Sequence, residues 1–323
     1  MKDTMRFAFG WVFLAIVAAV AGWFPAAPIA AAQTQSFQGQ DAVYNNSAQL
    51  TNSPSFIDAS MFASPGGNLC GVLNSVLTSK NYPAAGAVVD ARGLANSNPP
   101  TSMTCTTANP SPWAGIANPL PSTILLPATG GILPNLANPI IIPSTWIVPA
   151  NTRLVGEGDG IPSNGLTPGT TIQAASGFSG TMIQFGSAAS TGIAVERLTL
   201  DGQGQLGQSV SGIVNTESQA NSYVDHVSLY RILGTGLSVS GTANDSGPYS
   251  NITFDLGGVS GTSSTVCAKI NGLSGTRGIH GLSCTAENND PPAAVLLDSS
   301  NNSIEDVRIV GFYDGIRVGC RKV

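Results

Sequence analysis

The sequence predicts an all-β fold, a right-handed parallel β-helix (a solenoid) with an N-terminal capping helix. The first observation is a short apolar–polar segment that returns five times between Ile193 and Gly319, at spacings of 25 to 30 residues. The second is a further short strand that follows within several of these periods. The third is the abundance of glycine, at 38 residues, with no helical apolar period between the copies.

The five copies align on an apolar reference residue. They are residues 194–200, 223–229, 249–254, 279–284 and 304–309, aligned on Leu198, Val227, Ile252, Leu282 and Val307. The second strands are residues 236–239, 294–297 and 315–318. A β-propeller is the rival, but each blade needs roughly 40 residues. A leucine-rich repeat needs regular leucines and a fixed asparagine, which are missing. Stacked rungs would share one continuous core.

Composition excludes one class of partner. Charged residues make up 10% of the chain, and the net charge is −5 without a basic cluster. Nucleic-acid-binding domains carry a basic patch, so we expect no nucleic acid.

The N-terminus resembles a secretory signal peptide, residues 1–32. Lys2 and Arg6 precede an apolar run, residues 7–24, and three alanines end at Ala32. The alternative is an uncleaved membrane anchor, because 18 apolar residues are just enough to span a bilayer. If the signal peptide is cleaved, we expect no stable insertion of the protein into a membrane. We then expect a protein that is secreted, periplasmic or on the cell surface.

The remaining chain divides into three parts. Residues 33–85 form a polar leader and N-terminal cap, with a helix at about 68–79 that Asn68 can cap. Residues 86–319 form the β-helix, and residues 320–323 are an abrupt tail. No capping element follows Gly319, so we expect either a truncated longer β-helix or an oligomer whose neighbouring subunit covers the open end.

The five cysteines fit an exported chain. Cys70 and Cys105 form the plausible N-terminal pair. Cys267 with Cys284 is possible, but strand parity predicts that Cys284 faces inward and Cys267 outward. An odd count leaves at least one thiol over, and no spacing suggests zinc.

Two ladders of polar side chains are predicted where the chain bends. Two residues separate the inward-facing positions of each copy, and adjacent rungs lie about 4.8 Å apart. One ladder holds Glu196, Asp225, Ser250, His280 and Glu305, and its neighbour holds Arg197, His226, Asn251, Gly281 and Asp306.

The ladders supply the candidate catalytic residues Glu196, Asp225, His226, Arg197 and His280. Glu196 and Asp225 on adjacent rungs would suit a retaining glycosidase, whose carboxyl groups are about 5 Å apart. A lyase would need a base beside a uronate carboxylate, for which Arg197, Arg231 and His226 are candidates. The alternative is that polar residues at exposed bends only satisfy the backbone or form weak surface ion pairs.

Calcium is the one cofactor that the sequence suggests. Asp201, Asp225 and Glu196 could gather around Ca²⁺, which needs several oxygen ligands.

Several segments resemble the pectate-lyase-like superfamily. They are residues 88–93, 124–127, 153–158 and 198–202, together with 223–229 as one rung. In that superfamily a helix and a run of strands lead into a right-handed parallel β-helix. Asp225-His226 resembles the Asp-His pair of pectate lyases. Residues 278–283 approach the Gly-His-Gly run of polygalacturonases, but Ile279 interrupts it, and the Arg-containing motif of the lyases is missing.

The resemblance implies an exported polysaccharide-active protein, a lyase or a glycoside hydrolase on an acidic polysaccharide. Whether the chain is an enzyme stays open at this point. The alternatives are a non-catalytic glycan-binding or structural surface β-helix and a tailspike-like trimeric fibre, because fold alone does not decide function.

Overall fold

Parallel strands dominate the protein, as a computed structural model shows. The structure describes residues 55–96, 101–129, 139–161, 169–186, 190–204, 209–216, 221–240, 246–271, 278–287, 291–297 and 303–319. All of them belong to the unit Pro54–Val323, and the other unit, Met1–Ser53, lies outside the described residues. The predicted signal peptide, most of the polar leader, the tail and Cys320 therefore lie outside them too.

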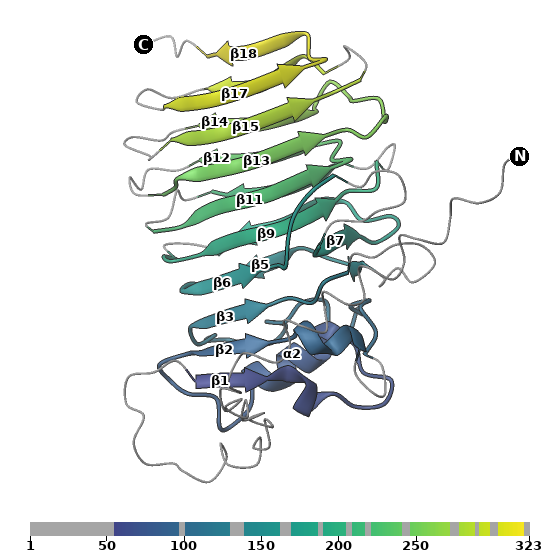
Figure 1. The fold of residues 1–323 in the computed structure, drawn as a ribbon, viewed down its shortest axis with the longest axis vertical. Helices are drawn as coiled ribbons and strands as arrows, with labels where there is room; N and C mark the ends of the chain where they lie inside the picture. The colour runs from purple at the N-terminus through teal and green to yellow at the C-terminus, as the bar shows by residue number, and fades with distance from the viewer. Residues whose placement is uncertain are drawn as a thin grey trace, which may run out of the picture. The chain divides into compact units, whose positions relative to one another are not determined.

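The larger of two sheets in the described part of the chain has eleven strands, all paired in parallel (Figure 1). Nine lie side by side in chain order, each one coil after the last: β1 (Ser55–Asp58), β2 (Ala87–Asp90), β3 (Ser122–Leu125), β6 (Thr152–Val155), β9 (Ala194–Asp201), β11 (Tyr223–Tyr230), β13 (Tyr249–Asp255), β15 (Ile279–Thr285) and β17 (Ile304–Val310). Two short strands, β4 (Ile140–Ile142) and β7 (Thr171–Ala174), pair with each other, and β7 also pairs with β9.

The smaller sheet has seven strands, again all parallel. They are β5 (Trp146–Val148), β8 (Gly180–Phe185), β10 (Val210–Asn215), β12 (Thr235–Ser240), β14 (Val266–Asn271), β16 (Ala293–Leu297) and β18 (Asp314–Val318). From β8 onward the chain alternates between the sheets, so each coil supplies one strand to each. This is a parallel β-helix, and the predicted repeat is confirmed as its coil.

The core is built from apolar ladders between the sheets. Strand register aligns the five reference residues from Leu198 to Val307. Leu198, Val227, Ile252 and Leu282 are almost fully buried, while Val307 in the last described coil is only partly buried. Burial of such side chains contributes about 1.5–3 kcal/mol each, which is why the register is firmly set.

The predicted bend is a backbone feature. Arg197, His226, Asn251 and Asp306 have φ of 55°, 51°, 53° and 53°, and Gly281 has φ of 69°. These five residues form one ladder in the left-handed region, which L-residues rarely occupy. The bend turns the preceding ladder, which includes Glu196 and Asp225, onto the outer surface of the sheet.

A helix precedes the main run of coils. Helix α2 spans Leu69–Leu77, and Asn68 accepts a hydrogen bond from the Gly71 N–H at 2.9 Å. Its buried face includes Leu69, Leu73 and Val76, which belong to the core. Two short 3₁₀ helices follow the first two strands: η1 (Ala59–Phe62) follows β1, and η2 (Arg92–Asn96) follows β2.

Two disulfides cross-link the unit. Cys70 in α2 is bonded to Cys105, as predicted. Cys267 is bonded to Cys284, and both are fully buried, so the prediction that Cys267 faces outward is wrong. Val266, Cys267 and Ala268 are three successive buried residues at the start of β14, where strict alternation of inward and outward residues fails.

No helix among the described residues is long and apolar enough to cross a membrane.

Candidate functional site

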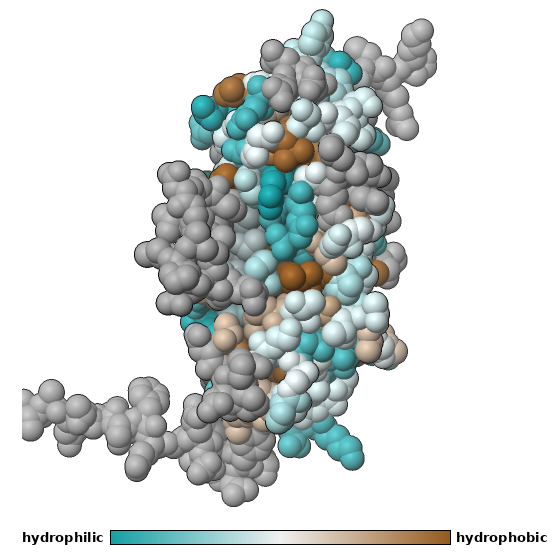
Figure 2. Space-filling view, turned by 90° about the vertical axis from the view of Figure 1, so that its right-hand side faces the viewer, coloured by the Kyte–Doolittle hydropathy of each residue, from teal (hydrophilic) through white to brown (hydrophobic). Residues whose placement is uncertain are grey.

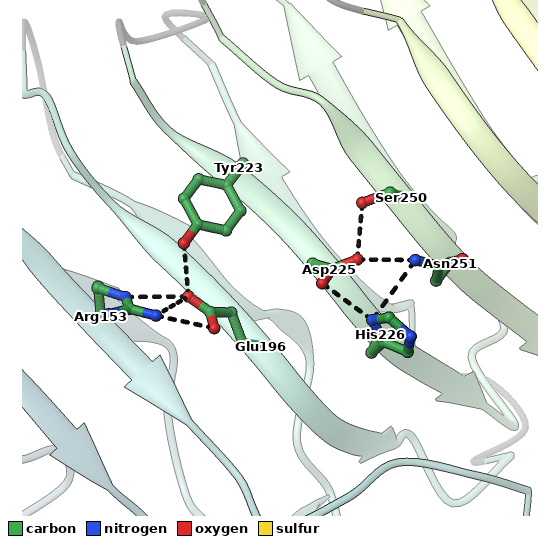
Figure 3. Close-up of polar contacts among 7 residues, drawn as sticks. All are labelled: Arg153, Glu196, Tyr223, Asp225, His226, Ser250 and Asn251. Atoms are coloured by element: carbon green, nitrogen blue, oxygen red, sulfur yellow. Dashed lines mark hydrogen bonds and ion pairs between the residues drawn. The ribbon is translucent and has the colours of Figure 1, made fainter.

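A charged cluster lies on the outer surface where β6, β9 and β11 run side by side (Figure 3). Arg153 donates to Glu196 through Nε at 3.0 Å and Nη2 at 2.9 Å, and the Tyr223 hydroxyl donates to Glu196 Oε1 at 2.7 Å. Burial raises the pKa of Tyr223, and the bond to Glu196 raises it further, so the phenol stays a donor. Glu196 is therefore held in place by two partners, with Arg153 and Tyr223 both donating to Oε1 and Arg153 alone donating to Oε2.

A second cluster lies on β11 and on the next strand of the sheet, β13, and it centres on Asp225. Its Oδ1 accepts from the Ser250 hydroxyl at 2.7 Å and from Asn251 Nδ2 at 3.0 Å, and its Oδ2 lies 2.9 Å from His226 Nδ1. Burial raises the pKa of Asp225, but the hydrogen bonds from Ser250, His226 and Asn251 outweigh it, and the net shift is downward. Asp225 is thus held as a carboxylate.

This arrangement fixes the tautomer of His226. An ionised carboxylate only accepts hydrogen bonds, so the proton of a neutral imidazole lies on Nδ1 and is donated to Asp225. Asn251 Nδ2, 3.4 Å from the same nitrogen, then donates to Asp225 instead. Nε2 keeps its lone pair, and the His226 side chain is 54% exposed. The result is an oriented, accessible base.

Asp159 is the residue that sequence reasoning missed. It lies in the segment after β6, and its Oδ2 accepts from the Ser228 hydroxyl of β11 at 3.1 Å. Gly160 in the same segment exchanges hydrogen bonds with the Thr199 side chain of β9. The segment therefore covers the outer face of both strands, and Ser228 and Thr199 are buried beneath it.

The pKa of Asp159 is shifted opposite to that of Asp225. Burial raises it, and the charges of His226 and Asp225 act on it in opposite directions, so the three groups lie within electrostatic reach of one another. Two carboxyl groups whose surroundings separate their pKa values are a common acid–base assignment in active sites. The sequence signal for Asp159 was only an aspartate between Gly158 and Gly160, with no partner in the repeat.

Arg197 borders this acid–base cluster, which we define as Asp159, Asp225 and His226. Its backbone carbonyl accepts from the Gly158 N–H at 3.0 Å, and its side chain is exposed at the bend, in the rung next to His226. A Cβ at Gly156 would collide with that carbonyl, so glycine at 156 permits the close approach. The structure thus brings together Asp225, His226 and Arg197 of the predicted catalytic residues.

The other predicted site residues lie elsewhere. His280 Nδ1 is 3.2 Å from Glu305 Oε2, two strands beyond His226. Arg231, a candidate base, forms an ion pair with buried Asp201, and its Cζ lies 4.8 Å from the centroid of the Tyr230 ring. These contacts hold Arg231 in a structural role at that end of β11.

The three carboxylates predicted to bind Ca²⁺ do not gather. Asp201 lies at the far end of β9, where Arg231 and Gln173 donate to it, while Glu196 and Asp225 are held by their own partners. In the described ranges no group of three or more His, Cys, Asp or Glu side chains could hold a metal ion. These three residues therefore do not fit a calcium site.

Figure 2 shows the face toward which the strands of the larger sheet point, and hydrophilic side chains gather in a band along its middle. Asp201, Arg231 and Gln173 all lie at these strand ends. Their mutual hydrogen bonds indicate a structural role, distinct from the cluster at the bend.

Comparisons with known proteins report only low similarities. No protein-family model and no curated protein matches the sequence. Among the solved structures that match in part are the A-modules of mannuronan C-5 epimerases AlgE6 and AlgE4 from Azotobacter vinelandii, with 14% and 11% identity over 80% and 78% of this chain, and ORF18 of Geobacillus virus E2, with 15% over 79%. The matches span 68%, 58% and 47% of those proteins, and their TM-scores are 0.29, 0.31 and 0.34. Scores this low carry no argument about the site, which has to be read from its own geometry.

Proposed function

We propose that this protein cleaves a uronate-containing polysaccharide by β-elimination. The observation that carries the proposal is the acid–base cluster: in the neutral imidazole of His226 the Nδ1–H is donated to Asp225, which leaves the lone pair on Nε2, and Asp159, whose pKa burial raises, lies within electrostatic reach. The superfamily resemblance of the sequence agrees with a polysaccharide substrate, but the reaction type rests on these side chains.

The base is His226. Its Nε2 takes the proton from C5 of the uronate unit, and the electron pair left on C5 forms the C4–C5 double bond. Asp225 keeps the ring in the reactive tautomer and stabilises the imidazolium that forms, as carboxylates do beside catalytic histidines. Positioned proton transfer of this kind contributes typically 10²–10⁴-fold in rate.

The acid is Asp159. As the C4–O4 bond breaks, the electron pair moves to O4, which takes a proton from the Asp159 carboxyl group. Burial favours the protonated form of this group, as general acid catalysis requires. Arg197 is the candidate partner of the uronate carboxylate, whose negative charge would otherwise oppose loss of the C5 proton.

A non-catalytic glycan-binding protein is the second candidate. The observation that favours it is that both oxygens of Asp225 and both oxygens of Glu196 already accept hydrogen bonds within the protein. A structural network on a solvated sheet would look the same. Hydrolysis by Asp159 and Asp225 is a third outcome, but those contacts leave Asp225 little freedom to activate water.

The finer features of the fold also belong to the proposal. A right-handed coil is supported by Figure 1, where strands of the larger sheet run left to right in front, later strands lie above, and β18 of the smaller sheet runs back. The role of α2 as a cap is supported by its buried face, which belongs to the same core as Val89 of β2, and by its contact with η1.

Export is proposed from residues 1–32 and is supported by the two disulfides, which form and persist in oxidising compartments. A Ca²⁺ requirement and association through the end beyond Gly319 stay predictions, and no step above depends on either.

The test is the product of turnover. The protein from Gln33 is incubated with polygalacturonate, alginate and neutral cellulose oligomers, with Ca²⁺ and with chelator, and both reducing ends and ultraviolet absorbance of unsaturated ends are followed. We expect both signals on at least one polyuronate and neither on the neutral polymer.

Three variants assign the result to the site. His226→Ala and Asp159→Asn should each lower turnover by about 10²–10⁴-fold, while Glu305→Gln, which removes a carboxylate from another rung, should not change it. Reducing ends without unsaturated ends would replace elimination by hydrolysis. Neither signal from folded protein, with retained binding, would favour the non-catalytic candidate.

A further inference from the structure

An open cleft lies on the same outer face, several coils before the acid–base cluster. Its volume is about 320 Å³, at the lower end of the ~300–1,000 Å³ typical of ligand sites. It is lined by residues that precede or begin β2, β3 and β6, among them Val88, Thr123, Asn151 and Arg153, together with Gly192.

Register connects this cleft to the cluster in a straight line. Val88, Thr123 and Arg153 occupy one ladder, which continues through Ala194 to Tyr223. Tyr223 lies two residues before Asp225 on β11, and Figure 3 shows the Arg153 group beside the Asp225 group. Thr123 is three strand spacings from β11, about 14 Å at roughly 4.8 Å per strand.

Small residues lie along this line. Ala194 lies between Arg153 and Tyr223 in the register and is almost fully buried, so its own side chain does not project between the cleft and the cluster. At Gly192, beside the cleft, a Cβ would lie 2.9 Å from the Asn151 side-chain oxygen.

Arg153 gives the cleft its chemistry. Its side chain is 49% exposed, and Glu196 accepts only from Nε and Nη2. The Tyr223 side chain also lies against this guanidinium. The guanidinium is half-exposed and held in place by Glu196, and its exposed part can donate to a carboxylate or hydroxyl of a ligand.

We propose that this cleft is a distal subsite that binds a uronate unit of the polysaccharide whose scissile bond lies at the acid–base cluster. The substrate then runs along the axis of the coils and so crosses the strands. A chain of several sugar units is needed to occupy both the cleft and the acid–base cluster. The identity of the ligand rests on the proposed function, while the cleft and its alignment do not.

The experiment measures affinity against ligand length. Binding of galacturonate and mannuronate hexamers and dimers is followed by calorimetry with Asp159→Asn protein, which keeps the ligands intact. We expect the hexamer of one uronate to bind about tenfold or more tightly than its dimer, because only the hexamer can reach the cleft while it occupies the cluster, and hydrogen bonds to charged groups are among the stronger ones.

Thr123→Trp in the same protein fills the cleft beside Arg153, and it should reduce hexamer affinity to that of the dimer. Ser238→Trp is the matched control, a small polar residue replaced on the outer face of the smaller sheet, and it should keep the difference. Cellohexaose, which lacks carboxylates, should bind at least about tenfold more weakly than the hexuronate.

Equal affinities for hexamer and dimer, or an unchanged hexamer affinity in Thr123→Trp, would overturn the subsite. Cellohexaose binding as tightly as the hexuronate would overturn the assignment of carboxylate recognition to Arg153. Length-dependent binding that Thr123→Trp abolishes, in a protein whose wild type shows no turnover, would uphold the subsite and refute the lyase.

Discussion

Asp159 and Asp225 show how neighbouring carboxyl groups on one surface acquire different chemistry. Asp225 receives hydrogen bonds from three side chains, which stabilise its charged form, whereas Asp159 is half-buried and, among the described residues, has one side-chain donor, Ser228. The repeat pattern identified Asp225, His226 and Arg197 because they occupy ladders. It could not identify Asp159, since the fold of its segment over β9 and β11 is set by tertiary contacts.

The raised pKa of Asp159 predicts a variant that loses activity without losing stability. A carboxyl group whose pKa is higher in the folded than in the unfolded state favours folding below its ordinary value of 3.8, and this contribution is lost as pH rises through the folded pKa. An asparagine at 159 cannot ionise, so the variant does not lose stability as pH rises through this pKa. At about pH 7 it should be at least as stable as wild type, while turnover falls about 10²–10⁴-fold.

Urea unfolding of both proteins at about pH 3.5 and about pH 7 checks this. The difference in unfolding free energy should shift in favour of Asp159→Asn at the higher pH. If Asp159→Asn were less stable than wild type at about pH 7 but not at about pH 3.5, ionised Asp159 would be stabilising. Its role as the acid would then be wrong.

The bend is the element that sets the site. Two residues between inward-facing positions predicted it, and the ladder of positive φ at Arg197, His226, Asn251, Gly281 and Asp306 confirms it. The sign of φ was not predicted, although four of the five residues (His226, Asn251, Gly281 and Asp306) are of the types enriched in this region, and only arginine is unusual there. The bend lifts His226 above the sheet, so the same backbone feature that strains the residue also exposes it.

Asp306 allows the cost of the bend to be measured away from the acid–base cluster. It has φ of 53° and is exposed in the last described coil. Asp306→Gly should be more stable than Asp306→Ala by about 1 kcal/mol, because a Cβ is unfavourable in the left-handed region. Arg308, exposed in the extended part of β17, is the matched control.

At Arg308 glycine should be less stable than alanine, by roughly 0.5–1 kcal/mol. Thermal unfolding of the four variants gives both differences. The same order of stability at the two positions would refute a left-handed conformation at Asp306.

At the scale of the whole molecule, the sequence predicted most of the architecture. Apolar ladders stack in register, so the coil repeat was visible in the order of residues, and the Cys70–Cys105 pair followed from proximity in the N-terminal part. The Cys267–Cys284 bond was a possible pair, but the outward position predicted for Cys267 is wrong because β14 buries three successive residues. Their burial depends on neighbouring coils that a single strand does not reveal.

The second disulfide should stabilise the stack. Replacing Cys267 and Cys284 together by alanine should lower the free energy of unfolding by about 2–4 kcal/mol, since the bond closes a loop of 17 residues. Urea unfolding with and without reductant measures this, and reduced wild type serves as the control.

Unreduced, denatured wild type should bind one equivalent of a thiol reagent, because four of its five cysteines are paired. More than one equivalent would contradict the pairing.

The most direct test of the account is hydrogen exchange at C5 of the substrate. A polyuronate oligomer is incubated in D₂O with wild type, Asp159→Asn and His226→Ala, and deuterium at C5 and chain cleavage are followed together by NMR. The account predicts cleavage by wild type, exchange with little cleavage in Asp159→Asn because the base remains and the acid is lost, and neither in His226→Ala. Exchange or cleavage that persists unchanged in His226→Ala would contradict it.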